Sequence, residues 1–172
     1  SEKLLSRCIN ALENQSAKKA FFEIAIADDG SNDETLEMLG TFKSRSELNL
    51  QWTNIKNSGP ATARNTGISI SSGIWIGFLD ADVIPHPDWV KTALELIRDN
   101  PSAGAFEGRT KVTQRGRATP FTHQTENYEG GRYLTCNLIV RKNLANFHQA
   151  YKIPFREDTD LAFSILESGY PI

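Results

Sequence analysis

The residues best suited to chemistry are two aspartates one position apart, Asp80 and Asp82. They follow the apolar run 74–79, which is too short for a core helix and is typical of a fully buried central strand in a parallel sheet. Ligands of open α/β sheets bind at the carboxyl ends of the strands. Two carboxylates spaced i and i+2 there can turn toward one hard cation, Mg²⁺ or Mn²⁺, that carries a phosphorylated ligand. The alternative is that Asp82 caps the turn before Pro85 and that Asp80 is an ordinary surface residue.

Acidic residues also occur where two other predicted elements end or begin. Asp28 and Asp29 follow the apolar run 21–27, which predicts a strand. Glu157 and Asp158 stand at the start of the last predicted helix. Carboxylates there offset the helix dipole, so ordinary capping is the alternative interpretation.

Helices and strands that alternate along the chain position these acidic groups. Apolar spacing predicts helices over 2–15, 33–46, 60–71 and about 89–97, a short helix near 142 and a last one after 157, with strands over 21–27, 48–52, 74–79, 103–112 and 134–140. Ser31 or Asn32 is predicted as the N-cap of the second helix, and Pro60 as the first residue of the third. The strand over 48–52 alternates apolar and polar residues and is expected near the sheet edge. Because an α/β domain normally opens with a strand, we expect an upstream strand to be absent from this stretch.

The composition indicates one globular domain. At 172 residues the chain is long enough to bury a core, and its net charge of -2 offers no basic surface for a nucleic-acid backbone. No apolar run approaches the roughly 20 residues that a membrane span needs, and the polar start does not predict a signal peptide. Cys8 and Cys136 lie far apart without a CxxC motif, so we expect buried free thiols rather than a disulfide or zinc site.

Four separated stretches together resemble the family 2 glycosyltransferases of GT-A fold. They are DDGS at 28–31, GPATARNTG at 59–67, DAD at 80–82 and EDTDL at 157–161, and their order and spacing also match. The resemblance implies an α/β, Rossmann-like three-layer sandwich with a mostly parallel central sheet, in which the family's opening strand is missing before Ser1. It also implies a single GT-A domain over 1–172, with a nucleotide-sugar-binding half (1–100) and an acceptor-side half (101–172).

The resemblance assigns the donor side to five residues. Asp28 is expected to bind the nucleotide base, and Asp29 has a less certain, structural role. Arg64 is expected near the nucleotide, with a buried structural arginine as the alternative. Asp80 is expected to contact the ribose or the metal, and Asp82 to ligate the metal that bridges the donor diphosphate.

The resemblance places the acceptor side in the C-terminal part of the chain. The resemblance implies that Asp158 is the general base for the acceptor hydroxyl, and that Glu157 supports it or contacts the acceptor. The polar, Gly-rich segment 113–132 is predicted to be a functional loop with a short helix. Residues placed near the acceptor on this basis are His123, Tyr128, Gly130, Gly131 and Asn137, although a plain loop is the alternative for most of them.

The expected function is metal-dependent, inverting transfer of a sugar from a nucleotide-diphosphate donor to an acceptor hydroxyl. Mn²⁺ or Mg²⁺ is the expected metal and a UDP-sugar the preferred donor. The acceptor is a saccharide, a lipid-linked molecule or another hydroxyl compound, in polysaccharide or glycoconjugate synthesis. The expected location is cytoplasmic, with peripheral attachment to the inner face of the membrane left open.

Two alternatives remain at this point. One is a noncatalytic or truncated domain that binds a nucleotide sugar. The other is a sugar-phosphate nucleotidyltransferase, which is disfavoured because no Gly-rich phosphate loop followed by Arg and Lys occurs near the start.

Overall fold

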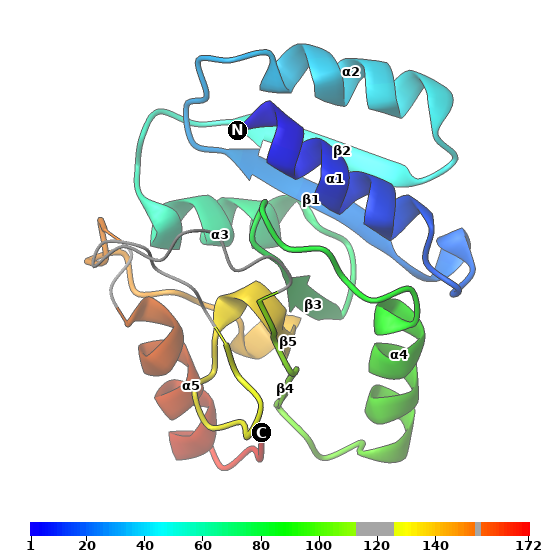
Figure 1. The fold of residues 1–172 in the computed structure, drawn as a ribbon. Coiled ribbons are helices and arrows are strands. Elements are labelled where there is room, and N and C mark those ends of the chain that lie inside the picture. The colour runs from blue at the N-terminus through cyan, green and yellow to red at the C-terminus, as the bar shows by residue number, and fades with distance from the viewer. Residues whose placement is uncertain (113–125, 154–155) are drawn as a thin grey trace.

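A parallel pair of strands organises the first part of the chain. The computed structural model describes residues 1–112, 126–153 and 156–172. Within them, β1 (Glu23–Asp28) pairs in parallel with β2 (Asn49–Asn54) along their whole length. Helices α1 (Glu2–Glu13) and α2 (Thr35–Arg45) cover one face of this pair, and α3 (Pro60–Ile70) lies on the other (Figure 1). A short 3₁₀ helix, η1 (Lys19–Phe21), leads from α1 toward β1.

A second sheet organises the rest of the chain. It has the order β3-β5-β4, with β3 (Trp75–Phe78), β4 (Ala105–Glu107) and β5 (Leu138–Arg141), and both of its pairs are antiparallel. Helix α4 (Trp89–Asp99) connects β3 with β4, and α5 (Glu157–Glu167) closes the described chain. The 3₁₀ helices η2 (Thr135–Asn137) and η3 (Lys142–Leu144) flank β5.

Each sheet has its own apolar core. The first joins α1 and α2 to β1 and β2 through Ile9, Leu39, Phe42 and Leu50, all at most 1% exposed. The second joins α3 and α5 to the three-stranded sheet, and its buried members are Ala61, Ile68, Phe78, Ala105, Leu138, Val140, Ala145, Phe147, Leu161 and Ile165. Because α3 contacts β1 and β2 and also contributes to the second core, it is the element shared by the two sheets.

The structure confirms the α/β class and the predicted helices within a few residues of their expected ends. Pro60 occupies the first turn of α3 as predicted, but the N-cap of α2 is Glu34 rather than Ser31 or Asn32. The strand expected over 103–112 shortens to β4, and the first part of the run 134–140 is η2. Strand β2 pairs only with β1 in the described residues, as expected for an edge position.

The prediction that 74–79 is a fully buried central strand is wrong. Of the residues in β3 only Phe78 is buried, and Ile74 just before the strand is 82% exposed. The physical reason is that, within the described residues, β3 pairs with β5 alone, while its other edge faces an apolar cleft of about 730 Å³ that is also lined by β1. We call this the β1–β3 cleft; it is lined by Phe22–Ala27, Gly73–Ala81 and apolar residues of α1, α3 and α4. The expected upstream strand stays a prediction.

Glu23 ties the two sheets together at the amino ends of their strands. Its carboxylate accepts hydrogen bonds from the backbone N–H of Ser72 (2.5 Å) and Gly73 (3.0 Å), just before β3. Its second oxygen accepts bonds from the side chains of Asn49 and Gln51 on β2. One carboxylate at the start of β1 thus holds both neighbours in place.

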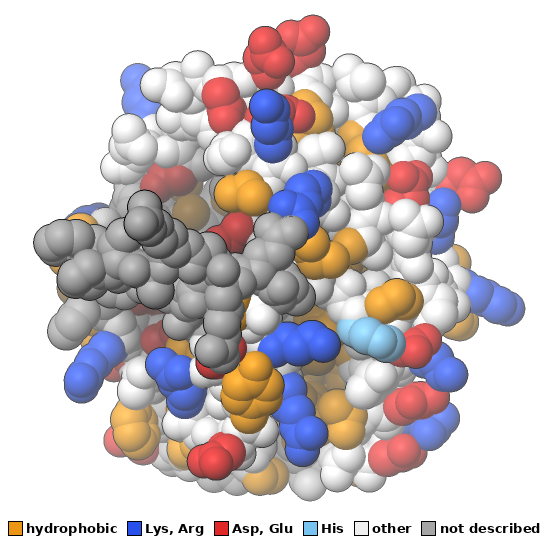
Figure 2. Space-filling view, viewed as in Figure 1, with side chains coloured by type: hydrophobic (Ala, Val, Ile, Leu, Met, Phe, Trp, Pro, Cys, Tyr) orange, Lys and Arg blue, Asp and Glu red, His pale blue; other side chains and the backbone are white. Residues whose placement is uncertain are grey.

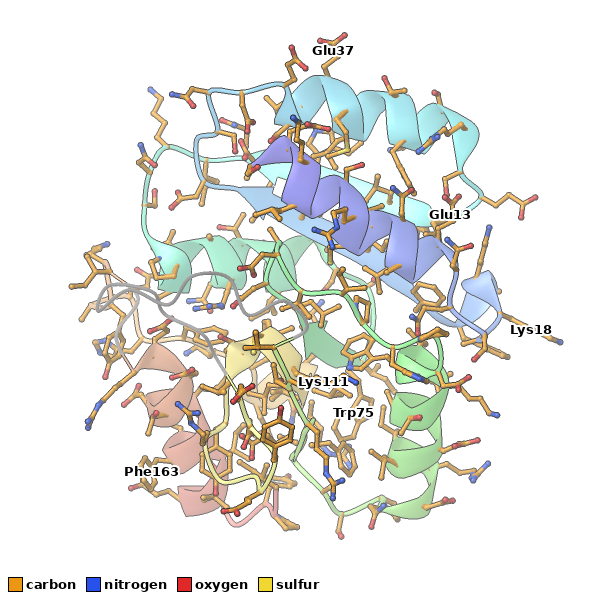
Figure 3. The ribbon with its side chains drawn as sticks, viewed as in Figure 1. Glu13, Lys18, Glu37, Trp75, Lys111 and Phe163 are labelled. Carbon is orange, nitrogen blue, oxygen red and sulfur yellow. The ribbon has the colours of Figure 1, made fainter. Side chains whose placement is uncertain are left out.

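An aromatic and cationic stack covers part of the second sheet. The ring of Trp75, which is labelled in Figure 3, has its centroid 5.5 Å from that of Phe106. The guanidinium carbon of Arg141 lies 4.6 Å from the Trp75 ring. The stack explains why Trp75 is less exposed than Ile74, which has no comparable cover.

The surface carries charges of both signs (Figure 2), and the two thiols lie inside the protein. Acidic and basic side chains are interspersed over the face in Figure 2. Cys8 and Cys136 are free and buried, as predicted. Among the helices of the described residues, none has the length and apolarity of a membrane span.

Candidate active site

Asp80 stands at the carboxyl end of β3, beside a cation and among other carboxylates. Its side chain is 47% exposed, and its Oδ1 lies 3.6 Å from Nη2 of Arg64. Partial burial raises the pKa of Asp80, and the negative charges of Asp82 and Asp158 raise it further, whereas Arg64 acts in the opposite direction. The structure therefore brings Asp158, from the start of α5, within electrostatic range of the Asp80 and Asp82 pair.

Asp82 lies in the exposed turn that follows Asp80. The turn is closed by a backbone bond from Val83 N–H to the carbonyl oxygen of Asp80, at 3.1 Å. Within the described part of the chain, the Asp82 carboxylate accepts no hydrogen bond, so the structure does not support the capping alternative. An exposed carboxylate beside a second one is available to a ligand.

Arg64 joins two carboxylates that are distant in sequence. Its Nη1 lies 2.6 Å from Oε1 of Glu157, which is 4% exposed, and its Nη2 faces Asp80. The guanidinium carbon lies 5.4 Å from the ring centroid of Phe147. Arg64 is thus packed and paired on several sides, and Glu157 is directed at Arg64 rather than at open solvent.

Asp158 occupies the first turn of α5. The residue before the helix, Arg156, has the left-handed backbone φ of 60°, which turns the chain sharply into α5. Asp158 is half-buried, and its Oδ1 accepts a hydrogen bond from the N–H of Thr159 at 2.8 Å. A carboxylate in this place is a group that can act as a general base.

The aspartates that follow β1 are held by local hydrogen bonds. Asp28 is 6% exposed, and its Oδ2 accepts bonds from Asn54 Nδ2 (2.5 Å) and Ser31 N–H (3.2 Å). Asp29 accepts bonds from the N–H groups of Ser58 (2.6 Å) and Gly59 (2.9 Å), directly before α3. This geometry gives Asp29 the structural role that was one expectation for it.

Gly59 shows how closely the chain packs at the start of α3. Its φ is 88°, and a Cβ built on it would lie 2.5 Å from the carbonyl oxygen of Lys152. A side chain at this position therefore meets both backbone strain and a steric clash. Segment 148–153 is thereby seated over the loop that Asp29 organises.

Asn54 is a neighbour of the candidate site that the sequence did not single out. It ends β2 directly opposite Asp28, the last residue of β1, in the parallel register. A polar residue at the end of the strand next to a predicted site strand was the available signal. Together, Asp28 and Asn54 offer a carboxylate and an amide at one sheet edge.

The donor atoms at Asp80 and Asp82 fit a hard divalent cation. Carboxylate oxygens suit Mg²⁺ and Mn²⁺, and Mg²⁺ is commonly held by only one or two carboxylates plus phosphate oxygens and water. In the described ranges, no group of at least three His, Cys, Asp or Glu side chains is arranged to hold a metal by itself. The pair therefore suits a cation that arrives with a phosphorylated ligand.

On the proposed acceptor side, Asn137 is engaged in internal bonds. Its Oδ1 accepts a hydrogen bond from Trp89 Nε1 at 2.8 Å, and its Nδ2 donates to the carbonyl oxygen of Arg109 at 3.0 Å. Its side chain thus connects α4 with the chain after β4.

Glu107 is a second residue that the sequence reasoning missed. Its carboxylate accepts hydrogen bonds from the backbone N–H groups of Gly131, Arg132 and Tyr133 and from Asn127 Nδ2. This carboxylate fixes the segment that contains Tyr128, Gly130 and Gly131, while His123 and the rest of 113–125 lie outside the described residues. Nothing in the local sequence pattern of Glu107 predicted that arrangement.

The fold and these acidic sites together define a GT-A glycosyltransferase domain. The chain belongs to glycosyl transferase family 2, whose model matches residues 1–163. This membership sets aside the nucleotidyltransferase alternative.

Named relatives agree with the family. Glycosyltransferase AglE of Haloferax volcanii is 35% identical over 148 residues, which are 81% of this chain and 49% of AglE. The poly(ribitol-phosphate) beta-N-acetylglucosaminyltransferase TarS of Staphylococcus aureus is 28% identical over 102 residues, 59% of this chain and 18% of TarS. The chain thus spans about half the length of AglE and less of TarS.

Solved structures agree with the fold. TarS 1-349 in complex with UDP-GlcNAc superposes with a TM-score of 0.74 at 23% identity, covering 95% of this chain and 49% of that one. The mannosyltransferase PcManGT of Pyrobaculum calidifontis, in complex with GDP-Man and Mn²⁺, has a TM-score of 0.74 at 20% identity, covering 99% and 50%.

Proposed function

We propose that this chain carries the catalytic domain of a metal-dependent, inverting glycosyltransferase that moves a sugar from a nucleotide-diphosphate donor to an acceptor hydroxyl. The observation that supports it best is that the charges of Asp82 and Asp158 both act on Asp80, although Asp80 and Asp82 follow β3 and Asp158 lies in α5. Leaving-group stabilisation and proton removal are the two needs of this reaction, and the site offers acidic groups for each.

On the donor side, Asp28 and Asn54 bind the nucleotide base, and Asp80 and Asp82 hold the cation that accompanies the diphosphate. That cation, Mn²⁺ or Mg²⁺, neutralises the charge that develops on the leaving diphosphate. Asp82 is its principal ligand because it is exposed and makes no competing hydrogen bond in the described residues. Residues 1–100 form this nucleotide-sugar-binding half.

On the acceptor side, Asp158 is the general base. It takes the proton of the acceptor hydroxyl as that oxygen forms a bond to the anomeric carbon of the sugar. The bond from that carbon to the diphosphate oxygen breaks, and its electron pair leaves with the nucleoside diphosphate. A single displacement of this kind inverts the anomeric configuration, and residues 101–172 form the acceptor-side half.

A UDP-sugar is the preferred donor in this proposal. The support is that TarS, a structural neighbour, is seen in complex with UDP-GlcNAc. PcManGT, seen with GDP-Man and Mn²⁺, supports metal use and makes GDP the second nucleotide to test. The acceptor is a saccharide, lipid-linked or other hydroxyl compound in polysaccharide or glycoconjugate synthesis, at a cytoplasmic site that can include the inner face of the membrane.

The deciding experiment measures release of nucleoside diphosphate from a panel of UDP- and GDP-sugars with Mn²⁺, Mg²⁺ or EDTA. Asp82→Asn is expected to lower the metal-dependent rate about 10²–10³-fold, as for loss of a preorganised electrostatic group. Asp158→Asn is expected to lower transfer about 10²–10⁴-fold, as for loss of a general base, while donor binding persists.

Asp33→Asn is a matched control, because Asp33 is 41% exposed and bonds to Thr35 and the N-terminus away from the site. It is expected to retain the wild-type rate. Binding of nucleotide without turnover, equal in wild type and Asp158→Asn, would replace this proposal with the noncatalytic alternative. A product whose anomeric configuration is retained by NMR would refute the inverting mechanism.

A further inference from the structure

Helix α3 is anchored to the C-terminal part of the chain by two successive residues. Asn65 forms a reciprocal pair with Phe147, since its Nδ2 donates to the Phe147 carbonyl oxygen (2.7 Å) and its Oδ1 accepts from the Phe147 N–H (2.9 Å). Arg64, one residue earlier, reaches Glu157 and Asp80. The uncharged pair already docks α3, so a second, charged connection at Arg64 calls for its own explanation.

Arg64 divides one positive charge between two unequal partners. The contact with Glu157 is short, at 2.6 Å, and Glu157 is almost fully buried. The contact with Asp80 is longer, at 3.6 Å, and Asp80 is about half exposed. The Asp80 contact is therefore the weaker of the two and the one more easily exchanged for a ligand.

A buried ion pair is a poor source of stability, because desolvation of both charges offsets most of their attraction. Removing only one partner is costly, since it leaves the other charge buried and unpaired. The Arg64–Glu157 pair thus fixes a position more than it stabilises the fold. The position it fixes is the first turn of α5, where Asp158 follows Glu157.

We propose that Arg64 is a positioning residue that couples cation binding at Asp80 and Asp82 to the order of the first turn of α5. A cation at these aspartates repels the guanidinium and takes up the charge of Asp80. The guanidinium of Arg64 then pairs with Glu157 and no longer with Asp80. The Arg64–Glu157 ion pair becomes stronger and orders the first turn of α5. This inference rests on the proposed function, because it gives the proposed base a fixed place only when the donor's cation is present.

The test is hydrogen exchange in the first turn of α5, with MnCl₂ as the probe. The Asp160 N–H donates to the Arg156 carbonyl oxygen at 3.0 Å and reports on this turn, as do the next two amides. In wild type, Mn²⁺ is expected to slow exchange of these amides about two- to fivefold, the size of effect of a half-exposed ion pair.

Three variants separate positioning from simple structural support. In Glu157→Gln and Arg64→Met, the ratio of exchange rates with and without Mn²⁺ is expected to fall to about one. Mn²⁺ affinity, measured by titration calorimetry, is expected to weaken in Glu157→Gln. It is expected to strengthen in Arg64→Met, because the guanidinium that repels Mn²⁺ is gone. Asn65→Ala loses the uncharged anchor and is expected to be less stable, yet to keep the response to Mn²⁺.

The following results support or overturn the proposed coupling. An unchanged Mn²⁺ response in Arg64→Met, or no response in wild type at millimolar Mn²⁺, overturns the coupling. Arg64→Lys keeps the charge without the fork that reaches two partners, so partial recovery of the response supports the coupling. Nucleotide-sugar turnover is measured on the same samples: coupling without turnover refutes only the proposed function, and turnover without coupling refutes only this inference.

Discussion

The carboxyl ends of β1 and β3 are both followed by aspartates, but the two pairs of aspartates have different hydrogen-bond partners. At the end of β1, Asp28 and Asp29 accept hydrogen bonds from backbone N–H groups and from the Asn54 amide. At the end of β3, Asp80 faces Arg64 at 3.6 Å, and partial burial, followed by the charges of Asp82 and Asp158, raises its pKa. Position at a strand end is therefore insufficient to assign a role. Asp28 and Asp29 shape a loop and a binding edge, whereas Asp80 and Asp82 are available to a cation.

The largest expected effect tests the end of β3. Asp80→Asn is expected to lower metal-dependent kcat/KM about 10²–10³-fold, because the cation loses a charged partner. The midpoint of urea unfolding is expected to stay near the wild-type value, because Asp80 is not part of either core. Steady-state kinetics and circular dichroism check the two halves of this prediction. If Asp80→Asn lost stability as well as activity, Asp80 would have a structural role like that of Asp29, and the prediction would be contradicted.

The next effect tests the end of β1. Asp29→Ala is expected to lower the free energy of unfolding by about 2–4 kcal/mol, because two N–H donors lose a charged acceptor. Asp29→Asn keeps one acceptor oxygen and is expected to lose about half as much. Urea denaturation followed by fluorescence measures both. A variant that is fully stable but inactive would show instead that Asp29 binds ligand.

A smaller effect concerns the opposite, amino ends of the strands. Although partial burial opposes it, hydrogen bonds from Ser72 and Gly73 lower the pKa of Glu23 below its ordinary value. A lowered pKa contributes stability above the ordinary pKa, and this stability is lost as the pH falls through the lowered one. Glu23→Gln is therefore expected to cost about 1 kcal/mol at pH 7 and much less near pH 3. A cost that is the same at both pH values would contradict the prediction.

The smallest effect uses Cys8 as a sensor of the charge at the end of β3. Burial, followed by the charges of Asp82 and Asp80, raises the pKa of Cys8 to about 11. Asp82→Asn is expected to speed labelling of Cys8 by a maleimide about twofold at pH 8, because more thiolate forms. Asp99→Asn, at an exposed position at the end of α4, is expected to leave the rate unchanged. Mass spectrometry of the labelled peptide separates Cys8 from Cys136.

Local patterns were enough to predict the helices and to place acidic residues after β1, after β3 and at the start of α5, because apolar periodicity is visible in neighbouring residues. They failed for β3, whose burial depends on which strands flank it and not on its own apolar side chains. They also missed Asn54 and Glu107, whose roles arise from strand register and loop closure. Arg64 and Glu157 are 93 positions apart in the sequence, so no local spacing predicts their pairing.

The strand edges that face the β1–β3 cleft also bear on how the given chain is expected to behave in concentrated solution. Within the described residues, the sides of β1 and β3 that line the cleft have no strand partner, so their backbone groups are free to bond to another chain. A net charge of -2 provides little mutual repulsion to prevent such contacts. Protein concentration, more than temperature, is therefore expected to determine how long the folded chain remains monodisperse.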